Sequence, residues 1–268
     1  MKLRRPPLLL LLSVLPLASA RADLSGFGTN GTGFTLNQGQ TTNGLSVSNN
    51  VATLTNGGNN QGNSLFSNTK QSFGAFRVSF TYQDVSPSSN GTADGFTFTL
   101  QNDTRGAAAV GGTGNSLGYA GAGGATTRAA VSPSVAVAFN IYSSSTTGLG
   151  TNGALTLGNT SLAVLGSGNP INITLAYNGT TLTETLTDTV NTANTSTFSY
   201  AVNLTSTLGS SGTAYVGFTG ATGAATATQR ISNFSYTVVP EPATWAAGGL
   251  TLLAGAALCW RRGKSAHG

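Results

Sequence analysis

The chain has 268 residues, of which only 7% are charged, and a formal net charge of +5. Most basic residues lie at the two ends, so the segment 23–239 carries five Lys or Arg against six Asp or Glu, a net charge of −1. Nucleic-acid binding requires clustered Lys and Arg, so the composition excludes a nucleic acid as the partner of this segment.

Residues 1–22 contain the three parts of a secretory signal peptide. A basic stretch at 2–5 precedes an apolar run at 8–17, and Ala-Ser-Ala follows at 18–20. This order is typical of a segment that signal peptidase removes after export. The alternative is an N-terminal membrane anchor, but the apolar run is shorter than the roughly 20 residues that a span needs. We therefore predict a signal helix and an exported chain.

The segment 23–238 contains repeated runs in which apolar and polar residues alternate. A period of two places the apolar side chains on one face of a sheet. Clusters of Asn, Gly and Ser separate the runs, and no stretch shows a helical period with caps. The clearest runs are 76–83, 96–100, 135–141, 171–177 and 198–204. We predict one all-β domain of two antiparallel sheets packed face to face.

Two features of this central segment limit what it can do or how it folds. The only cysteine is Cys259, so no disulfide can form, and core burial must hold a domain of about 215 residues together. The Gly-rich stretch 106–130 lacks a clear period, which predicts a long loop or two short strands.

Catalytic constellations are missing from the central segment. The only histidine is His267, so neither a Ser-His-Asp triad nor a Cys-His pair can form there. A zinc site requires clustered His or Cys, and the central segment contains neither residue. Glycosidases normally need two carboxyl groups about 5–10 Å apart, and the acids stand singly except for Glu184 and Asp188. We therefore expect a protein that is not an enzyme.

Residues 239–268 contain a second targeting pattern. A Pro-Glu-Pro motif precedes an apolar segment at about 243–260 and a basic tail, which together fit a C-terminal anchor with a cytoplasmic end. The same order resembles the PEP-CTERM sorting signal. That resemblance implies an exosortase-type membrane protease as partner, a membrane-anchored intermediate, and a final location at the cell surface or outside the cell. The residues of the motif and tail are Pro240, Glu241, Pro242, Arg261 and Arg262.

Several short motifs of the central segment follow one another in the order found in legume-type (L-type) lectins. The string Thr-Ala-Asp-Gly-Phe-Thr-Phe at 92–98 resembles the Ala-Asp-Gly motif of the family, in which the Asp accepts hydrogen bonds from sugar hydroxyls. The resemblance covers about residues 24–238 and implies a concanavalin-like jelly-roll sandwich that binds carbohydrate. Other matching motifs lie at 114–119, 134–140, 215–223 and 231–236.

The resemblance also implies which residues contact the sugar. Asp94 is the leading candidate, although an isolated acid at the start of a strand could equally cap a turn. Structural roles also stay open for the other candidates. The remaining candidates for carbohydrate contact are Gly118, Asn140, Asn152 and Thr222.

The metal-binding strand of the family departs from its usual pattern in this chain. It usually reads Glu-Phe-Asp, with both acids binding metal, and here it reads Ala138-Phe139-Asn140. Asn140 and Tyr142 are the candidates for contacts to Ca²⁺, but a hard cation prefers several charged oxygens. The metals order the sugar loops in the family. The alternative function is therefore a structural matrix or surface protein with a lectin fold that binds neither sugar nor metal.

Overall fold

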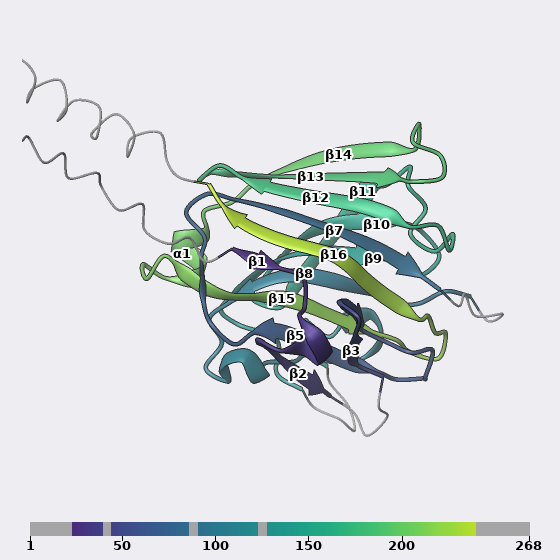
Figure 1. The fold of residues 1–268 in the computed structure, drawn as a ribbon, viewed down its shortest axis with the longest axis horizontal. Coiled ribbons are helices and arrows are strands. Elements are labelled where there is room, and N and C mark those ends of the chain that lie inside the picture. Colours follow the sequence, from purple (N-terminus) through teal and green to yellow (C-terminus); the bar gives the residue numbers. More distant parts are fainter. Residues whose placement is uncertain (1–22, 40–43, 86–90, 123–127, 240–268) are drawn as a thin grey trace, which may run out of the picture. The chain divides into compact units, whose positions relative to one another are not determined.

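The computed structural model describes residues 23–39, 44–85, 91–122 and 128–239, and Figure 1 shows them in colour. Residues 22–239 form one compact unit. The predicted signal peptide and the Pro-Glu-Pro motif, apolar segment and basic tail lie outside the described residues, so they stay predictions. Within the described ranges, no helix has the length and apolar character that crossing a bilayer requires.

Two antiparallel sheets of eight strands each make up the domain (Figure 1). Sheet I contains, in spatial order, β14 (Thr195–Ala201), β13 (Thr181–Asp188), β12 (Ile171–Tyr177), β7 (Phe76–Asp84), β16 (Gln229–Val238), β4 (Val51–Thr53) and β3 (Ser46–Ser48), with β1 (Leu24–Ser25) on β16. Sheet II contains β11 (Ala154–Thr160), β10 (Thr146–Thr151), β9 (Ser134–Asn140), β8 (Gly95–Gln101), β15 (Thr213–Ala221), β5 (Gly62–Ser67) and β2 (Phe34–Gln38), with β6 (Gln71–Ser72) on β15.

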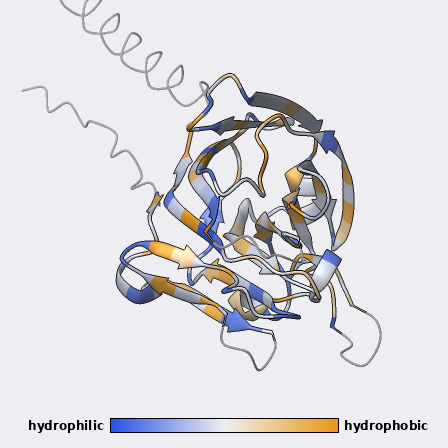
Figure 2. Cartoon of the chain, turned by 90° about the vertical axis from the view of Figure 1, so that its right-hand side faces the viewer, coloured by the Kyte–Doolittle hydropathy of each residue, from blue (hydrophilic) through white to orange (hydrophobic). Residues whose placement is uncertain are grey.

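Sheet I follows the predicted alternation closely. Every second residue of β7, β12 and β13 is buried, and Figure 2 shows hydrophobic and hydrophilic positions alternating along the strands. The buried side chains face sheet II. The other face is exposed to solvent and carries mostly Thr, Ser and Asn side chains. The runs at 76–83 and 171–177 are therefore confirmed as strands.

The run at 198–204 is confirmed only in part. Strand β14 ends at Ala201, and the short helix α1 (Leu204–Leu208) follows. The side chain of Asn203 accepts a hydrogen bond from the N–H of Ser206 and so caps this helix. Asn is a favoured N-cap residue, but five residues are too few to show a helical period in the sequence.

Sheet II is covered on its outer side by the Gly-rich segment. Residues of β8 are buried on both faces, because the described parts of this segment, 106–122 and 128–131, pack over sheet II. The segment contains the 3₁₀ turns η2 (Gly106–Ala108) and η3 (Gly114–Ser116) and one isolated bridge, Ala122 to Arg128. It is thus a long loop without named strands among its described residues, which is the first of the two predicted forms.

Hydrogen bonds and one ion pair hold this cover in place. The hydroxyl of Thr219 in β15 donates to the carbonyl of Leu117, and that of Ser64 in β5 donates to Ala109. At the base of the cover, Arg105 pairs with Asp103 at 2.7 Å and also donates to the carbonyls of Val110 and Ala130, among others. The Arg105 guanidinium and nearby backbone N–H groups lower the pKa of Asp103, although burial opposes them.

The core between the sheets is rich in aromatic rings. The ring of Phe80 from sheet I meets the ring of Phe218 from sheet II edge to face at 5.0 Å between centroids. Phe96 stacks on Phe139 at 4.5 Å and on Tyr82 at 4.4 Å. Such contacts contribute about 0.5–1.5 kcal/mol each beyond simple burial. The domain is therefore held by core packing.

Candidate functional site

Three loops meet at one end of sheet II. Strand β8 begins at Gly95, which pairs with the last residue of β9, Asn140, and with the last residue of β15, Ala221. The chain before β8 and the chain after β9 and β15 are therefore neighbours, although they lie far apart in the sequence. At this end of the sheet, Asp94 lies near the loops that contain Gly114 and Gly223 and near the segment after β9.

The main chain of Asp94 is fixed on both sides. Its N–H donates to the carbonyl of Ala221 at 3.0 Å, and its carbonyl accepts from the N–H of Ile141 at 2.9 Å. The peptide bond between Ala93 and Asp94 is cis. Ala93 is buried while Asp94 is half-buried, so the carboxyl group sits at the surface end of a well-anchored segment.

The carboxyl group of Asp94 is only partly satisfied by hydrogen bonds from the protein. Its buried Oδ2 atom makes no hydrogen bond within the described part of the chain. Burial raises the pKa of Asp94 to about 6, and the backbone N–H of Gly223 only partly opposes this shift. A buried acceptor without a donor is costly. The group therefore favours a ligand that brings hydrogen-bond donors.

Two glycines leave space next to the carboxyl group of Asp94. A Cβ atom on Gly223 would lie 3.2 Å from Asp94 Oδ2 and 3.6 Å from the Cα of Gly114. Gly114 has φ +61° and donates its N–H to the carbonyl of Thr222 at 3.0 Å. Asn115, the next residue, is exposed. The sequence analysis placed Gly114 and Gly223 inside matching motifs but not among the contact candidates, because glycines contribute here by lacking a side chain.

Two of the predicted contact residues lie beneath this surface. Thr222 is buried, and its hydroxyl donates to the carbonyl of Gly58 at 2.6 Å and accepts from the N–H of Gln61 at 3.0 Å. Gly118 is buried too, and its N–H donates to the carbonyl of Gly112. Both residues hold the loops, and their own polar groups face inward.

Asn152 does not join the other candidates. It lies in the turn between β10 and β11, where its side chain accepts a hydrogen bond from the N–H of Ser134 at 3.0 Å. Ser134 begins β9 and Asn140 ends it, so the two ends are about 20 Å apart at 3.3 Å per residue. The structure therefore separates Asn152 from Asp94 by the length of a strand.

Asn140 lies at the site but is engaged by its own loop. Its Nδ2 group donates to the carbonyls of Tyr142 and Ser144 at 3.0 and 3.1 Å, and to the hydroxyl of Thr146 at 3.2 Å. This amide closes the short segment between β9 and β10. Tyr142 contributes its carbonyl to that closure and is 52% exposed.

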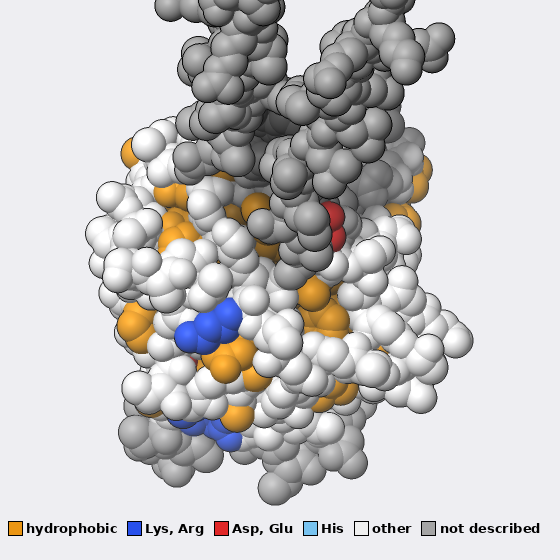
Figure 3. All heavy atoms as spheres, turned by 60° about the vertical axis from the view of Figure 1, so that its left-hand side comes forward, with side chains coloured by type: hydrophobic (Ala, Val, Ile, Leu, Met, Phe, Trp, Pro, Cys, Tyr) orange, Lys and Arg blue, Asp and Glu red, His pale blue; other side chains and the backbone are white. Residues whose placement is uncertain are grey.

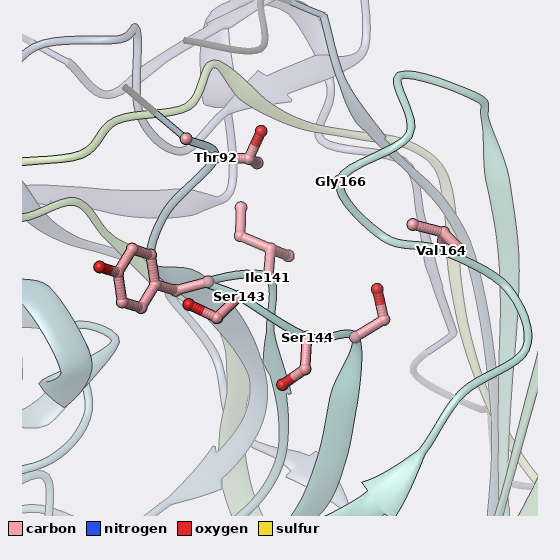
Figure 4. A pocket seen from close by; sticks show the side chains of 9 residues that line it. Thr92, Ile141, Ser143, Ser144, Val164 and Gly166 are labelled. Carbon is pink, nitrogen blue, oxygen red and sulfur yellow. The ribbon is translucent and has the colours of Figure 1, made fainter. Parts of the chain in front are cut away.

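A hollow of about 490 Å³ lies near this segment. Its lining includes Thr92, two residues before Asp94, and Ile141, whose N–H donates to the Asp94 carbonyl, but Asp94 itself does not line it. Figure 4 shows Thr92 and Val164 on opposite sides, with Ile141 and Ser144 from the segment after β9. Among the described residues that line it, none is charged and several carry hydroxyl groups. The lining comprises Gly91, Thr92, Ile141, Tyr142, Ser143, Ser144, Ser145, Val164 and Gly166.

The residues present do not fit the metals that the sequence resemblance implies. A Ca²⁺ ion takes six to eight oxygen ligands, several of them carboxylates. Ala138 offers no side-chain oxygen and is fully buried, and Asn140 turns N–H donors toward the neighbouring oxygens. Within the described ranges, no three His, Cys, Asp or Glu residues cluster as a metal site would require.

The surface away from this site carries few charges. Figure 3 shows a face of mostly uncharged groups with isolated basic side chains. This agrees with the composition and gives no clustered positive surface on that face for a polyanion.

Comparison with known proteins identifies the family. The family model of the legume lectin domain matches residues 26–249. Among curated proteins, no sequence matches this chain.

Solved structures share the fold at low sequence identity. A lectin from Bauhinia forficata in complex with GalNAc has a TM-score of 0.64 at 19% identity, covering 80% of this chain and 96% of its own. Basic winged bean lectin with Tn-antigen has a TM-score of 0.63 at 19% identity, covering 82% and 100%. Arcelin-5, a lectin-like defense protein from Phaseolus vulgaris, has 0.62 at 16%, covering 80% and 96%.

Proposed function

This chain belongs to the legume lectin family, and from that premise we propose that it binds carbohydrate at the end of sheet II, around Asp94. The observation that carries the proposal is the half-buried Asp94 carboxyl group, whose Oδ2 atom makes no hydrogen bond to the described residues. Sugar hydroxyls are donors of the kind that this atom needs.

The hollow near the Asp94 segment suits a neutral sugar, although Asp94 itself does not line it. Hydroxyl groups of Thr92, Ser143 and Ser144 line it together with the apolar side chains of Ile141 and Val164. Sugars present the same mixture of hydroxyl groups and apolar C–H surface. The absence of charge among the described lining residues favours uncharged units over uronates or sulfated sugars.

Tyr142 supplies an aromatic surface at the rim of this hollow. The residue is 52% exposed, while its carbonyl accepts a hydrogen bond from Asn140. An amphipathic ring on a fixed backbone can pack against the apolar face of a sugar at little entropic cost. The relatives crystallised with GalNAc and with Tn-antigen support a carbohydrate ligand of this general kind.

A second candidate function is a structural matrix protein that keeps the fold and binds no sugar. It is favoured by the inward engagement of Thr222, Gly118 and Asn152, which use their polar groups to hold loops. In that case the Asp94 carboxyl group would only border a turn.

We also propose that the chain is exported by its N-terminal signal and sorted through its C-terminal motif by an exosortase-type protease, with a transient membrane anchor. The final location would be the cell surface or the extracellular matrix. This part of the proposal is supported by the sequence patterns alone. Intact-mass measurement of the protein recovered from culture tests it, because two cleavages shorten the chain at both ends.

The test of binding is a glycan array probed with the full-length protein in mild detergent. Asp94→Asn should weaken any binding by about 10- to 100-fold, since a hydrogen bond to a charged group contributes about 1.5–3 kcal/mol. Glu184→Gln is the matched control, because it also removes a buried carboxyl group but lies inside the sandwich. Equal binding by Asp94→Asn would remove the site, and an empty array would favour the structural function.

A further inference from the structure

The amide of Asn140 lies where the short segment 141–145 closes between β9 and β10. We infer that the hydrogen bonds of this amide replace a bound metal ion. They order the segment 141–145, which lines the hollow, without a divalent cation. The consequence for sugar binding rests on the proposed function, whereas the ordering of the segment does not.

The geometry shows an amide surrounded by oxygen atoms. Asn140 pairs with Thr146 in the register of β9 and β10, so its side chain lies at the base of the connection. Its Nδ2 group is within 3.0–3.2 Å of two carbonyl oxygens and one hydroxyl oxygen, from Tyr142, Ser144 and Thr146. Carbonyl oxygens only accept, which fixes the NH₂ end of the amide toward the loop.

A bound cation would organise the same oxygens by attracting them to one point. An NH₂ group attracts them too, because its two hydrogens carry partial positive charge. The NH₂ group and a bound cation exclude each other here, since the two hydrogens point at the oxygens that a cation would use. Ala138, two residues earlier on the same face of β9, adds no oxygen that could compensate.

The held segment forms one side of the hollow. Ile141, Tyr142, Ser143 and Ser144 all line it, and the N–H of Ile141 donates to the carbonyl of Asp94. Asn140 is therefore a positioning residue for the ligand site, acting through the loop and without contact to the ligand.

Hydrogen exchange of the full-length protein tests this inference without any sugar. The readout is the protection of the Ile141 and Thr146 amides, which donate to Asp94 and Ser144. In the wild-type protein, protection should be the same with EDTA and with millimolar Ca²⁺. In Asn140→Asp, a carboxylate would face three oxygens, so exchange should be about tenfold faster in EDTA.

The loss of protection in Asn140→Asp should persist in millimolar Ca²⁺, because one added carboxylate still leaves fewer oxygens than the six to eight that Ca²⁺ takes. Asn152→Asp is the matched control: it makes the same chemical change at the other end of β9 and keeps the oxygen that accepts from Ser134. Faster exchange of the wild-type segment in EDTA would overturn the inference. Unchanged protection in Asn140→Asp would overturn it as well.

If the exchange results are as expected but the glycan array is empty, the metal-free loop stands and only the proposed ligand falls. If sugar binds but the wild-type loop loses protection in EDTA, the proposed ligand stands and the metal-free loop falls. The two proposals can therefore fail separately.

Discussion

Two carboxyl groups, Asp94 at the end of sheet II and Glu184 inside the sandwich, are alike in their protonation and unlike in their surroundings. Burial raises the pKa of Asp94 to about 6 and that of Glu184 to about 7. Each has one oxygen atom without a hydrogen bond to the described residues. A raised pKa and an unpaired oxygen are thus shared by both positions.

The surroundings of Glu184 are those of an internal link between sheets. It lies on β13 of sheet I and accepts a hydrogen bond from the hydroxyl of Tyr200 at 2.7 Å. That hydroxyl also accepts from Asn159 of β11 at 2.9 Å and lies 3.4 Å from the hydroxyl of Thr147 in β10. Glu184 is fully buried, so it links sheet I to sheet II out of reach of a ligand.

The difference teaches that a perturbed pKa does not by itself mark a functional site. Asp94 is distinguished by its half-buried position at the end of sheet II, next to two glycines that leave space. Glu184 is distinguished by polar neighbours from three strands. Three measurements sharpen or break this comparison.

The largest expected effect is on the pH dependence of stability through Glu184. Its pKa is raised from an ordinary value near 4.5 to about 7, so the folded state holds the proton more tightly than the unfolded state. Stability should therefore fall as pH rises from 4.5 to 7, by about 3 kcal/mol. Glu184→Gln should remove this contribution and leave the fall below pH 6 that the raised pKa of Asp94 adds. Urea unfolding at pH 4.5, 6 and 8 measures it, and identical slopes in both proteins would contradict it.

The next effect is on the pH dependence of sugar affinity through Asp94. A carboxylate accepts hydrogen bonds at both oxygens, whereas the protonated acid loses acceptor capacity. Affinity should therefore be flat above the pKa of about 6 and fall about tenfold per pH unit below it. Titration calorimetry from pH 4.5 to 8 measures this. Glu184→Gln should keep the dependence, and a flat profile in the wild-type protein would break the comparison.

The smallest effect concerns Tyr142. Replacing it by Ala should change the free energy of unfolding by less than about 0.5 kcal/mol, because the ring is largely exposed. Sugar affinity should drop by about 2- to 10-fold, as expected for the loss of one aromatic contact. Tyr142→Phe serves as control and should keep the affinity. A loss in both variants would point to the hydroxyl group in place of the ring.

The sandwich was predictable because its signal is local. Alternation in β7 and β12 is visible residue by residue, and each run is long enough to define a face. The cover over sheet II was not predictable in detail. It has no period, and distant partners hold it, such as Ser64 on Ala109 and Thr219 on Leu117.

For the candidate site, the sequence indicated only the proposed centre. The Ala-Asp-Gly motif pointed to Asp94, but sequence cannot show which polar atoms are already satisfied. Thr222 and Gly118 match the family pattern and still direct their groups inward. Asn152 follows Asn140 by twelve positions, but the intervening strand β10 carries it to the opposite end of β9.

The cover over sheet II makes the two outer faces of the sandwich unequal. A sandwich of two bare sheets has two broad outer faces, but here the middle strands of sheet II are closed off. Sheet I alone presents a wide solvent-facing surface, with ranks of threonine hydroxyls such as Thr185 beside Thr197 at 3.0 Å. Arg77 and Arg230 add two exposed positive charges to this face. The broad surface that this domain offers for contacts is therefore the hydroxyl-rich outer face of sheet I.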